Sequence, residues 1–246
     1  MLRQFNRVFL FMVVLLLTFS VATVFAAKQY PDLKAAEVKE MMATGDVLVV
    51  FPLSPIEYDD LHIKYAVNVP MDLLATKLPQ DKSKKMIFYC LGIKCVASWR
   101  AAEKALELGY ENVYTFREGL PAWVDAGYPT VTTAKLPDVP VNRISTADLA
   151  ARLDNENFTL IDINLNADAQ KFWIEHPNRV HVPLDELKAR VSELDKSDEI
   201  AVMCLKGKRS PTAVRFLISQ GFENVVMVEG GIQKWVLEGR PVQQGS

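Results

Sequence analysis

Two kinds of hydrophobic pattern alternate along the chain. Short solid runs of apolar residues, typical of strands buried on both faces, occur at 47–51, 85–89, 113–116, 158–163, 199–203 and 225–228. Between them, apolar residues recur every three or four positions, which predicts helices at 32–43, 98–108, 145–153 and 211–220, with a short helix through Trp123. This alternation predicts an α/β fold in which each parallel sheet is flanked by helices on both faces.

A constant offset of 112 residues relates the two halves of the chain. The offset joins residues of the same type, among them Ser98 and Ser210, Gly109 and Gly221, Trp123 and Trp235, and Pro129 and Pro241. A period of this length is too long for a solenoid and indicates two similar domains in tandem. We expect a first domain at 30–129, a polar, proline-rich linker at 130–141 and a second domain at 142–243. The paired tryptophans are predicted to pack in the two cores.

The first residues differ from everything that follows. Arg3 and Arg7 precede an apolar run at 8–25, and Val24 and Ala26 are small residues at the −3 and −1 positions of a signal-peptidase site. This pattern predicts an export signal at 1–26, cleaved after Ala26. The alternative is that residues 8–26 remain as a membrane anchor, because the run is just long enough to span a bilayer. In both cases we expect a periplasmic or otherwise exported protein, with membrane contact only if the segment is uncleaved.

Composition narrows the classes of function. The chain has 28 Lys and Arg against 30 Asp and Glu, and this balance argues against a nucleic-acid partner. Three cysteines are too few to stabilise a chain of 246 residues by disulfides, so a disulfide scaffold is excluded. The odd number leaves at least one thiol unpaired or joined to a partner. The cysteines and histidines lack any spacing typical of a metal site, and we expect no metal and no cofactor.

One cysteine stands directly after the predicted strand at 199–203, where open α/β sheets place their sites. The segment there reads Cys204-Leu-Lys206-Gly207-Lys208-Arg209-Ser210-Pro211. Gly207 permits a turn, and Ser210 is expected to cap the next helix, with Pro211 at its first position. The loop amides, the helix dipole and the three cations favour a thiolate and form a cradle for an anion. The alternative interpretation is a buried structural cysteine beside a solvated run of charge.

Taken together, the motifs resemble the rhodanese domain. They are Cys204-x-x-Gly-x-Arg-Ser, Gly221-Phe-x-x-Val, Glu229-Gly-Gly-Ile, Trp235, Gly239 and Pro241 in the second unit, and Glu57-Tyr, His62-Ile, Val67-Asn-Val-Pro and Tyr89-Cys in the first. The resemblance implies sulfur transfer through a persulfide on Cys204, with Lys206, Gly207, Lys208, Arg209 and Ser210 holding a small sulfur-containing anion. The six residues from Cys204 to Arg209 match the sulfur-transferring form, because related phosphatases have one residue more.

The resemblance also gives Asp162, at the end of the strand at 158–163, a supporting role. It implies that this aspartate helps to hold the catalytic loop, and we expect it to pair with or orient Arg209. The alternative is an aspartate that caps a turn. Arg179 is either an anion-binding group or, as we prefer, a surface arginine.

The first unit departs from the family pattern. Phe51 and Leu53 stand where an Asp and an Arg are expected, and Ala97 stands opposite Arg209. Its loop spans eight positions from Cys90 to Ser98, instead of six, and contains a second cysteine, Cys95. By strand position, Cys90 is the better counterpart of Cys204. The pair Cys90 and Cys95 is open to three interpretations: a redox-active disulfide that resolves a persulfide, a structural disulfide, or two free thiols.

The leading hypothesis is an exported sulfurtransferase that moves sulfane sulfur from thiosulfate or a polysulfide through Cys204 to a thiol, a protein or another thiophilic acceptor. In it, Cys90 belongs to a structural, regulatory or second sulfur site. Two alternatives remain open. One is a thiol redox or persulfide-relay protein that uses Cys90 and Cys95, and the other is a binding module that carries sulfur species without catalysis.

Overall fold

The computed structural model describes residues 30–153 and 158–245. The predicted export signal lies outside the described residues. Among the helices that are described, none combines the length and the hydropathy needed to cross a bilayer.

Domain 1 is built around a parallel sheet with the strand order β3-β1-β4-β5. Its strands are β1 (Val47–Phe51), β3 (Val67–Asn68), β4 (Lys85–Tyr89) and β5 (Val113–Phe116). Its helices are α1 (Ala35–Ala43), α2 (Pro55–Asp60), η1 (Met71–Leu73), α3 (Leu74–Lys77), α4 (Ala97–Glu107) and α5 (Gly119–Asp125). Two further strands, β2 (His62–Ile63) and β6 (Thr130–Val131), pair in antiparallel fashion.

Domain 2 repeats this plan with the strand order β10-β8-β11-β12-β7. Its strands are β7 (Arg143–Ile144), β8 (Phe158–Asp162), β10 (Arg179–His181), β11 (Glu199–Met203) and β12 (Val225–Val228). Its helices are α6 (Thr146–Arg152), α7 (Asn166–Ala169), α8 (Leu184–Arg190), η2 (Val191–Glu193), α9 (Ser210–Ser219) and α10 (Gly231–Leu237). The short strands β9 (Phe172–Trp173) and β13 (Gln243–Gln244) form an antiparallel pair.

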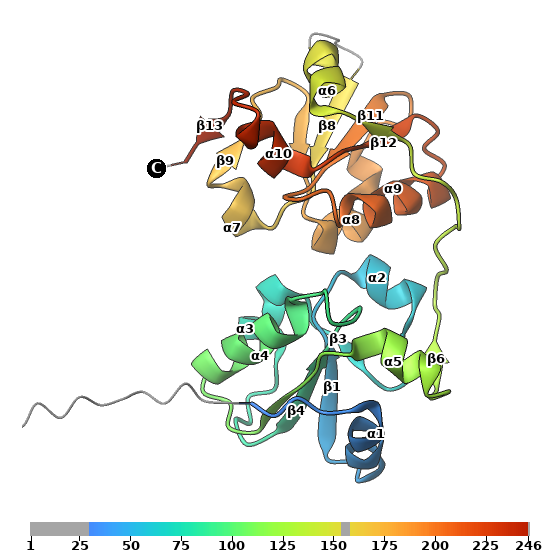
Figure 1. Ribbon diagram of the computed structural model, residues 1–246, viewed down its shortest axis with the longest axis vertical. Helices are drawn as coiled ribbons and strands as arrows, with labels where there is room; N and C mark the ends of the chain where they lie inside the picture. The colour runs from blue at the N-terminus through green and yellow to red at the C-terminus, as the bar shows by residue number, and fades with distance from the viewer. Residues whose placement is uncertain (1–29, 154–157, 246) are drawn as a thin grey trace, which may run out of the picture.

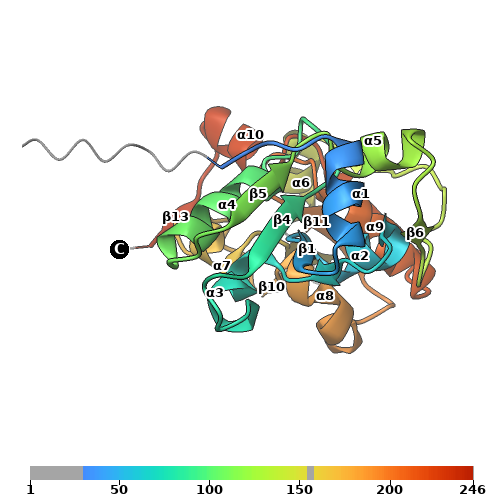
Figure 2. The ribbon, with the colours of Figure 1, turned by 90° about the horizontal axis from the view of Figure 1, so that it is seen from below.

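The solid apolar runs are explained by burial on both faces of each sheet. Along β4, Ile87 and Tyr89 pack with α1 and α5, whereas Met86 and Phe88 pack with α3 and α4 on the other face. Because successive side chains of a strand point to opposite faces, every position of such a strand must be apolar. In Figure 2, β1 and β4 accordingly lie between α1 and α4. The predicted α/β fold with helices on both faces of a parallel sheet is confirmed.

The predicted strands and helices are found within a few residues of their expected positions. The helix expected from residue 32 begins at Ala35, because Asp32 pairs with Thr115 beside the sheet. Trp123 and Trp235 are buried, as predicted, and each indole donates a hydrogen bond to the backbone six residues along, to Pro129 and Pro241. The duplication seen in the sequence is therefore also a duplication of side-chain packing.

The predicted linker at 130–141 is only partly a free connection. Its first residues form β6 and pair with β2 of domain 1. The amides of Thr133 and Ala134 then donate to the carbonyl oxygen of Asp59, and the Leu136 amide donates to the Asp60 carboxylate at 2.9 Å. The start of the linker is thus structurally part of domain 1.

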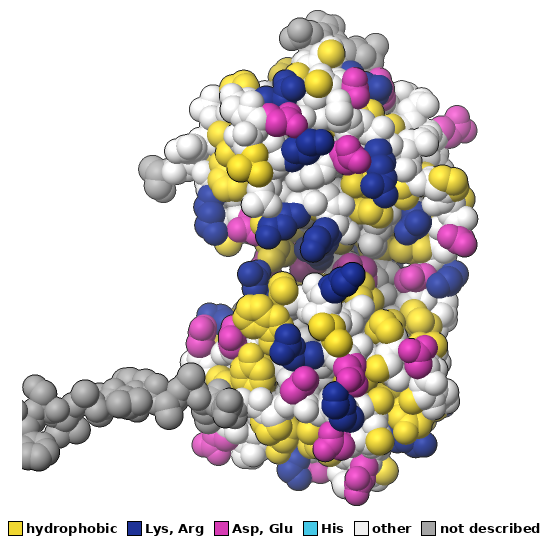
Figure 3. Space-filling model, in the orientation of Figure 1, with side chains coloured by type: hydrophobic (Ala, Val, Ile, Leu, Met, Phe, Trp, Pro, Cys, Tyr) yellow, Lys and Arg dark blue, Asp and Glu magenta, His cyan; other side chains and the backbone are white. Residues whose placement is uncertain are grey.

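The two domains lie one above the other, and the linker runs along one side (Figure 1). The helix α2 of domain 1 lies against α8 and α9 of domain 2. An ion pair between Asp59 and Lys188 crosses the interface. In Figure 3, basic side chains gather on the part of domain 2 that borders the groove between the domains. The loop of Cys204 leads into α9, so it lies on the side of domain 2 that domain 1 approaches.

Candidate active site

Cys204 lies at the carboxyl end of β11, inside the loop that leads into α9. Its side chain is buried, and the backbone amide of Arg209 points to its sulfur at 3.4 Å. Its carbonyl oxygen accepts a hydrogen bond of 3.0 Å from the amide of Ile232 in α10. This hydrogen bond fixes the loop to the start of α10. The Arg209 amide faces the sulfur, where it can stabilise a negative charge.

Close backbone approach explains two glycines around this loop. Gly207 and Gly231 have φ values of +72° and +61°. A Cβ on Gly207 would lie 2.9 Å from the Gly230 nitrogen, and a Cβ on Gly231 would overlap the Cys204 carbonyl oxygen. Glycine is thus required at these positions for both conformation and space, so that the loop can rest directly on the start of α10.

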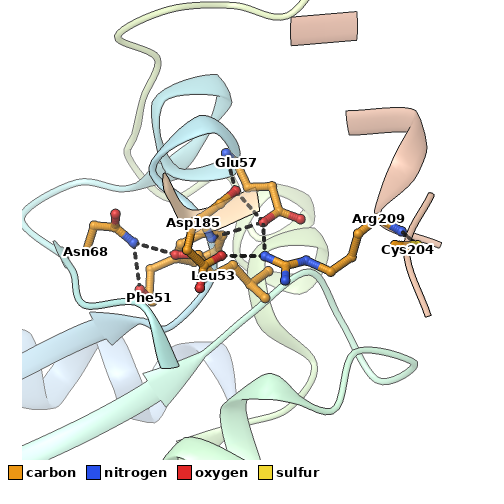
Figure 4. Close-up of polar contacts among 8 residues, drawn as sticks. Phe51, Leu53, Glu57, Asn68, Asp185, Cys204 and Arg209 are labelled. Carbon is orange, nitrogen blue, oxygen red and sulfur yellow. Dashed lines mark hydrogen bonds and ion pairs between the residues drawn. The ribbon is translucent and has the colours of Figure 1, made fainter. Parts of the chain in front are cut away.

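The three cations of the loop have different environments. Lys206 and Lys208 are exposed. The Arg209 side chain instead turns toward carboxylates, with Nη2 2.5 Å from Asp185 Oδ1 and 3.7 Å from Glu57 Oε2 (Figure 4). Burial lowers the pKa of Arg209, but Asp185 and Glu57 more than offset this and raise it above its ordinary value. Arg209 is therefore already neutralised locally, and the two lysines are the loop cations that remain open to an anion.

A third carboxylate adds to the negative charge here. Burial and the charge of Asp185 raise the pKa of Asp72, in η1 of domain 1. Glu57 itself is fixed by a capping box, because its carboxylate accepts hydrogen bonds from the amide and hydroxyl of Ser54 at 3.0 and 2.7 Å. Domain 1 therefore contributes ordered acidic groups to the surroundings of the Cys204 loop.

The expectation that Asp162 pairs with Arg209 is wrong. Asp162 is fully buried, and its carboxylate accepts hydrogen bonds from Arg179 at 2.7 Å and from the Asn164 side chain at 2.8 Å. The sheet order explains this choice, because β10 lies directly beside β8 with His181 opposite Asp162, which puts Arg179 within reach. Arg179 is thus neither an ordinary surface arginine nor an open anion-binding group.

The expected cap by Ser210 is also wrong. The helix α9 begins at Ser210, and the residue before it, Arg209, makes no side-chain cap. The Ser210 hydroxyl points inward, is buried, and has no hydrogen-bond partner among the described residues. Pro211 is the second residue of α9, whereas the sequence predicted it at the first position. It still lies in the first turn, where a backbone amide has no partner within the helix. The hydroxyl is therefore a buried polar group at the start of α9, without a hydrogen-bond partner in the part of the chain that the structure describes.

The loop of domain 1 is anchored in the same way as that of domain 2. The Cys90 carbonyl oxygen accepts a hydrogen bond of 2.9 Å from the amide of Leu120, which is the repeat counterpart of Ile232. Cys90 is therefore the structural counterpart of Cys204, as its strand position predicted. The two extra residues of the loop lie after Cys90, and both Cys90 and Cys95 are free thiols in the structure. Phe51 and Leu53, at the expected Asp and Arg positions, are buried apolar residues.

A cavity of about 380 Å³ lies between the domains beside the linker. Its lining includes Glu57 and Leu91 of domain 1, Leu136 of the linker, and Thr212 and Arg215 of domain 2. None of the described residues that line it is a cysteine. It adjoins the surroundings of both loops without opening directly onto either sulfur.

The sequence did not single out Asp185 or Asn164, and it gave Glu57 no role. The capping box Ser54-x-x-Glu57 was a local signal that this glutamate is held in place. No local signal pointed to Asp185, because its contact with Arg209 depends on how α8 lies beside the loop.

The same two stretches that carry these loops match a known family. Residues 34–126 and 145–238 each match the rhodanese-like domain, and together they cover well over half of the chain. The chain belongs to the rhodanese family. It contains this domain twice, with one six-residue loop ending in Arg209 and one longer loop that holds two cysteines.

Two curated relatives and one solved structure each match about one domain of this tandem rhodanese chain. A sulfurtransferase from Allochromatium vinosum is 33% identical over 103 residues, which are 42% of this chain and 94% of the relative. The thiosulfate sulfurtransferase GlpE of Actinobacillus pleuropneumoniae is 32% identical over 92 residues, covering 37% of this chain and 82% of that protein. A solved structure of a rhodanese-related protein from Thermoplasma volcanium is 36% identical, with a TM-score of 0.38, and covers 42% of this chain and 97% of that protein. The two sulfurtransferases support sulfur transfer as the general chemistry.

Proposed function

We propose that the chain is an exported sulfurtransferase, which moves sulfane sulfur from thiosulfate or a polysulfide through a persulfide on Cys204 to a thiophilic acceptor. The observation that carries this proposal is the buried Cys204 sulfur, which faces the Arg209 amide at 3.4 Å while Lys206 and Lys208 are exposed on the same loop. An amide donor stabilises a thiolate or a persulfide anion, and the lysines attract an anionic donor.

The reaction has two steps. The Cys204 thiolate attacks the outer sulfur of thiosulfate, a sulfur–sulfur bond forms, and sulfite leaves with the electron pair of the broken bond. The Arg209 amide then holds the negative charge of the persulfide. In the second step, a thiolate or cyanide attacks the outer sulfur, and the Cys204 thiolate leaves in its original state. No metal or redox partner is required, because the sulfane sulfur passes between nucleophiles at each step.

Loop size and the relatives favour sulfur over phosphate. The six residues from Cys204 to Arg209 match the sulfur-transferring form of the loop. The likeness to a thiosulfate sulfurtransferase, although it covers only 37% of this chain, supports thiosulfate as a donor. We expect the acceptor to be a small thiol or a protein thiol.

Export is proposed from the sequence of residues 1–26 alone. The intact mass of the protein recovered from the periplasm or the medium tests it. A mature chain that begins at Ala27 supports a cleaved signal. A full-length chain in the membrane fraction indicates an anchor instead, and a full-length chain in the cytosol contradicts export.

The chemical proposal is tested by replacing Cys204 with Ser in the full chain. The wild-type protein incubated with thiosulfate should gain about 32 Da and transfer sulfur to cyanide, whereas Cys204→Ser should do neither. Cys95→Ser is the matched control, and it should keep thiosulfate-dependent transfer at the wild-type rate. Full activity in Cys204→Ser would overturn the assignment.

A further inference from the structure

Cys90 and Cys95 are brought together by a turn at the start of the longer loop. Gly92 has a φ of +111°, and the Cys95 amide donates to its carbonyl oxygen at 2.9 Å. The chain thereby returns toward Cys90, whose sulfur lies 3.3 Å from the Cys95 carbonyl oxygen. The two cysteines are not joined by a disulfide. The longer loop of domain 1 thus places a second sulfur at the position where domain 2 has only one.

The two sulfurs share a proton unequally. The Cys95 thiol is the main group that lowers the pKa of Cys90, to about 6, and the hydroxyl and amide of Ser98 and the amide of Gly92 add to this effect. Hydrogen bonding to Cys90 and burial raise the pKa of Cys95. Cys90 Sγ also lies 3.3 Å from the Cys95 carbonyl oxygen, which accepts a hydrogen bond when Cys90 is protonated. Cys90 is therefore the thiolate of the pair at neutral pH, and the proton stays on Cys95.

Exposure divides the roles of the two cysteines. Cys90 is completely buried, whereas Cys95 is partly exposed. Cys90 is thus the inner thiolate at the base of its loop, as buried as Cys204 is in domain 2, and Cys95 lies closer to solvent. This arrangement of an inner thiolate and an outer thiol suits a dithiol that takes up sulfur and then closes to a disulfide.

The surface around Cys95 is apolar, in contrast to the loop of Cys204. Three large apolar side chains of this loop are exposed, namely Leu91 at 44%, Ile93 at 67% and Val96 at 43%. Lys94 is the only charged residue at 91–96, whereas the loop of domain 2 holds three cations. An apolar rim of this kind favours a compound whose sulfur is attached to an organic group over a small dianion such as thiosulfate.

We propose that Cys90 and Cys95 form a second sulfur site, a dithiol that reduces organic persulfides and releases their sulfane sulfur as sulfide. This site acts independently of the sulfur transfer proposed for Cys204. Domain 1 lacks a counterpart of Arg209, and in this proposal its loop carries out a reaction different from that of domain 2.

The reaction balances in two steps. The Cys90 thiolate attacks the outer sulfur of R–S–SH, so that the organic thiolate leaves, takes the proton of Cys95 to become RSH, and Cys90 carries a persulfide. Cys95, now a thiolate, then attacks the Cys90 sulfur and expels the outer sulfur as hydrosulfide. The sulfane sulfur is reduced to sulfide, and the dithiol is oxidised to the Cys90–Cys95 disulfide. An external dithiol reductant restores the two thiols by exchange.

The test uses the full chain carrying Cys204→Ser, which removes the sulfur chemistry of domain 2. The protein is reduced, desalted without oxygen, and mixed with the persulfide of 2-mercaptoethanol or, in a second arm, with thiosulfate. With the persulfide we expect about one sulfide per chain and a loss of about 2 Da in the peptide that contains both cysteines. With thiosulfate we expect a reaction at least about tenfold slower.

Second variants separate the steps. Cys95→Ser added to Cys204→Ser should keep a stable persulfide, about 32 Da heavier, on Cys90 and release no sulfide. A chain without any of the three cysteines gives the background. A stable persulfide in the Cys204→Ser chain without sulfide release or disulfide would overturn the proposal, and so would the absence of any reaction there. The sulfur transfer by Cys204 is measured separately, in the Cys95→Ser chain with thiosulfate. Failure of one reaction therefore does not imply failure of the other.

Discussion

Arg209 of domain 2 and Glu57 of domain 1 face each other across the interface, with Nη2 3.7 Å from Oε2. The same guanidinium is 2.5 Å from Asp185 of its own domain. The last residue of the Cys204 loop is thus neutralised partly by the neighbouring domain. Domain 1 therefore influences the electrostatic field at Cys204 although it contributes no residue to that loop.

Replacing Glu57 with Gln should make the Cys204 loop more attractive to anions. The variant keeps the capping geometry but removes one negative charge from Arg209, so the KM for thiosulfate should fall about two- to fivefold at low salt, with kcat nearly unchanged. Asp59→Asn is the matched control, because it removes a charge at the interface that pairs with Lys188. Steady-state kinetics that give a higher KM for Glu57→Gln would contradict this role.

Removing Lys206 and Lys208 together should have the opposite effect. If these exposed lysines attract the donor, the double Ala variant should raise the KM for thiosulfate about five- to tenfold and weaken its dependence on salt. Lys171→Ala serves as the control, since Lys171 pairs with Asp168 and lies outside the loop. An unchanged KM and salt dependence would assign donor binding to the loop amides alone.

Arg179→Ala should destabilise domain 2 without slowing persulfide formation on the folded protein. It leaves the fully buried carboxylate of Asp162 without its cationic partner, and we expect the free energy of unfolding to fall by about 3 kcal/mol in urea denaturation. Arg152→Ala breaks the more exposed pair with Glu199 and should cost less than about 1 kcal/mol. A slower reaction of Arg179→Ala at full stability would instead place the Asp162 pair in the chemistry.

Two glycine variants distinguish backbone strain from steric overlap. Gly239→Ala should cost about 1 kcal/mol, because φ is +71° there but no atom lies within 4 Å of the added Cβ. Gly231→Ala should cost clearly more, about 3 kcal/mol, because its Cβ would overlap the Cys204 carbonyl oxygen. Urea denaturation of both variants measures the difference. Equal costs would mean that the loop can move away from α10.

The thiolate of domain 1 should appear at an unusually low pH. In the Cys204→Ser chain, the absorbance of one thiolate at about 240 nm should rise as pH increases, with a midpoint of about 6 for Cys90, and should be lost below it. Ser98→Ala removes a hydroxyl that stabilises the thiolate, so the midpoint should move to higher pH. A midpoint near the ordinary cysteine pKa of about 8.5 would show that the pair shares its proton differently.

Much of the fold could be predicted because both faces of each sheet are buried, so strands such as 85–89 and 199–203 carry an apolar residue at nearly every position. The 112-residue offset between the two halves then predicted two domains in tandem. The place of Cys204 followed from the rule that sites lie at the carboxyl ends of parallel strands.

The partners of the charged side chains could not be predicted in this way. Asp162 was expected to pair with Arg209. Its actual partner, Arg179, depends on β10 lying beside β8, which no local pattern encodes. The contact of Arg209 with Glu57 depends on the packing of one domain against the other. The inward direction of the Ser210 hydroxyl likewise depends on the path of the whole loop.

The pairing of β6 with β2 changes where the chain can be divided. A fragment of domain 1 that stops at Pro129 would discard the strand at Thr130–Val131 and leave the backbone of His62 and Ile63 without its partner. It would also lose the amides that bind the Asp59 carbonyl oxygen and the Asp60 carboxylate at the end of α2, the helix that presents Glu57 to the other domain. A cut after Leu136 keeps these hydrogen bonds, so the natural boundary for expressing the domains separately lies within the proline-rich segment and not at its start.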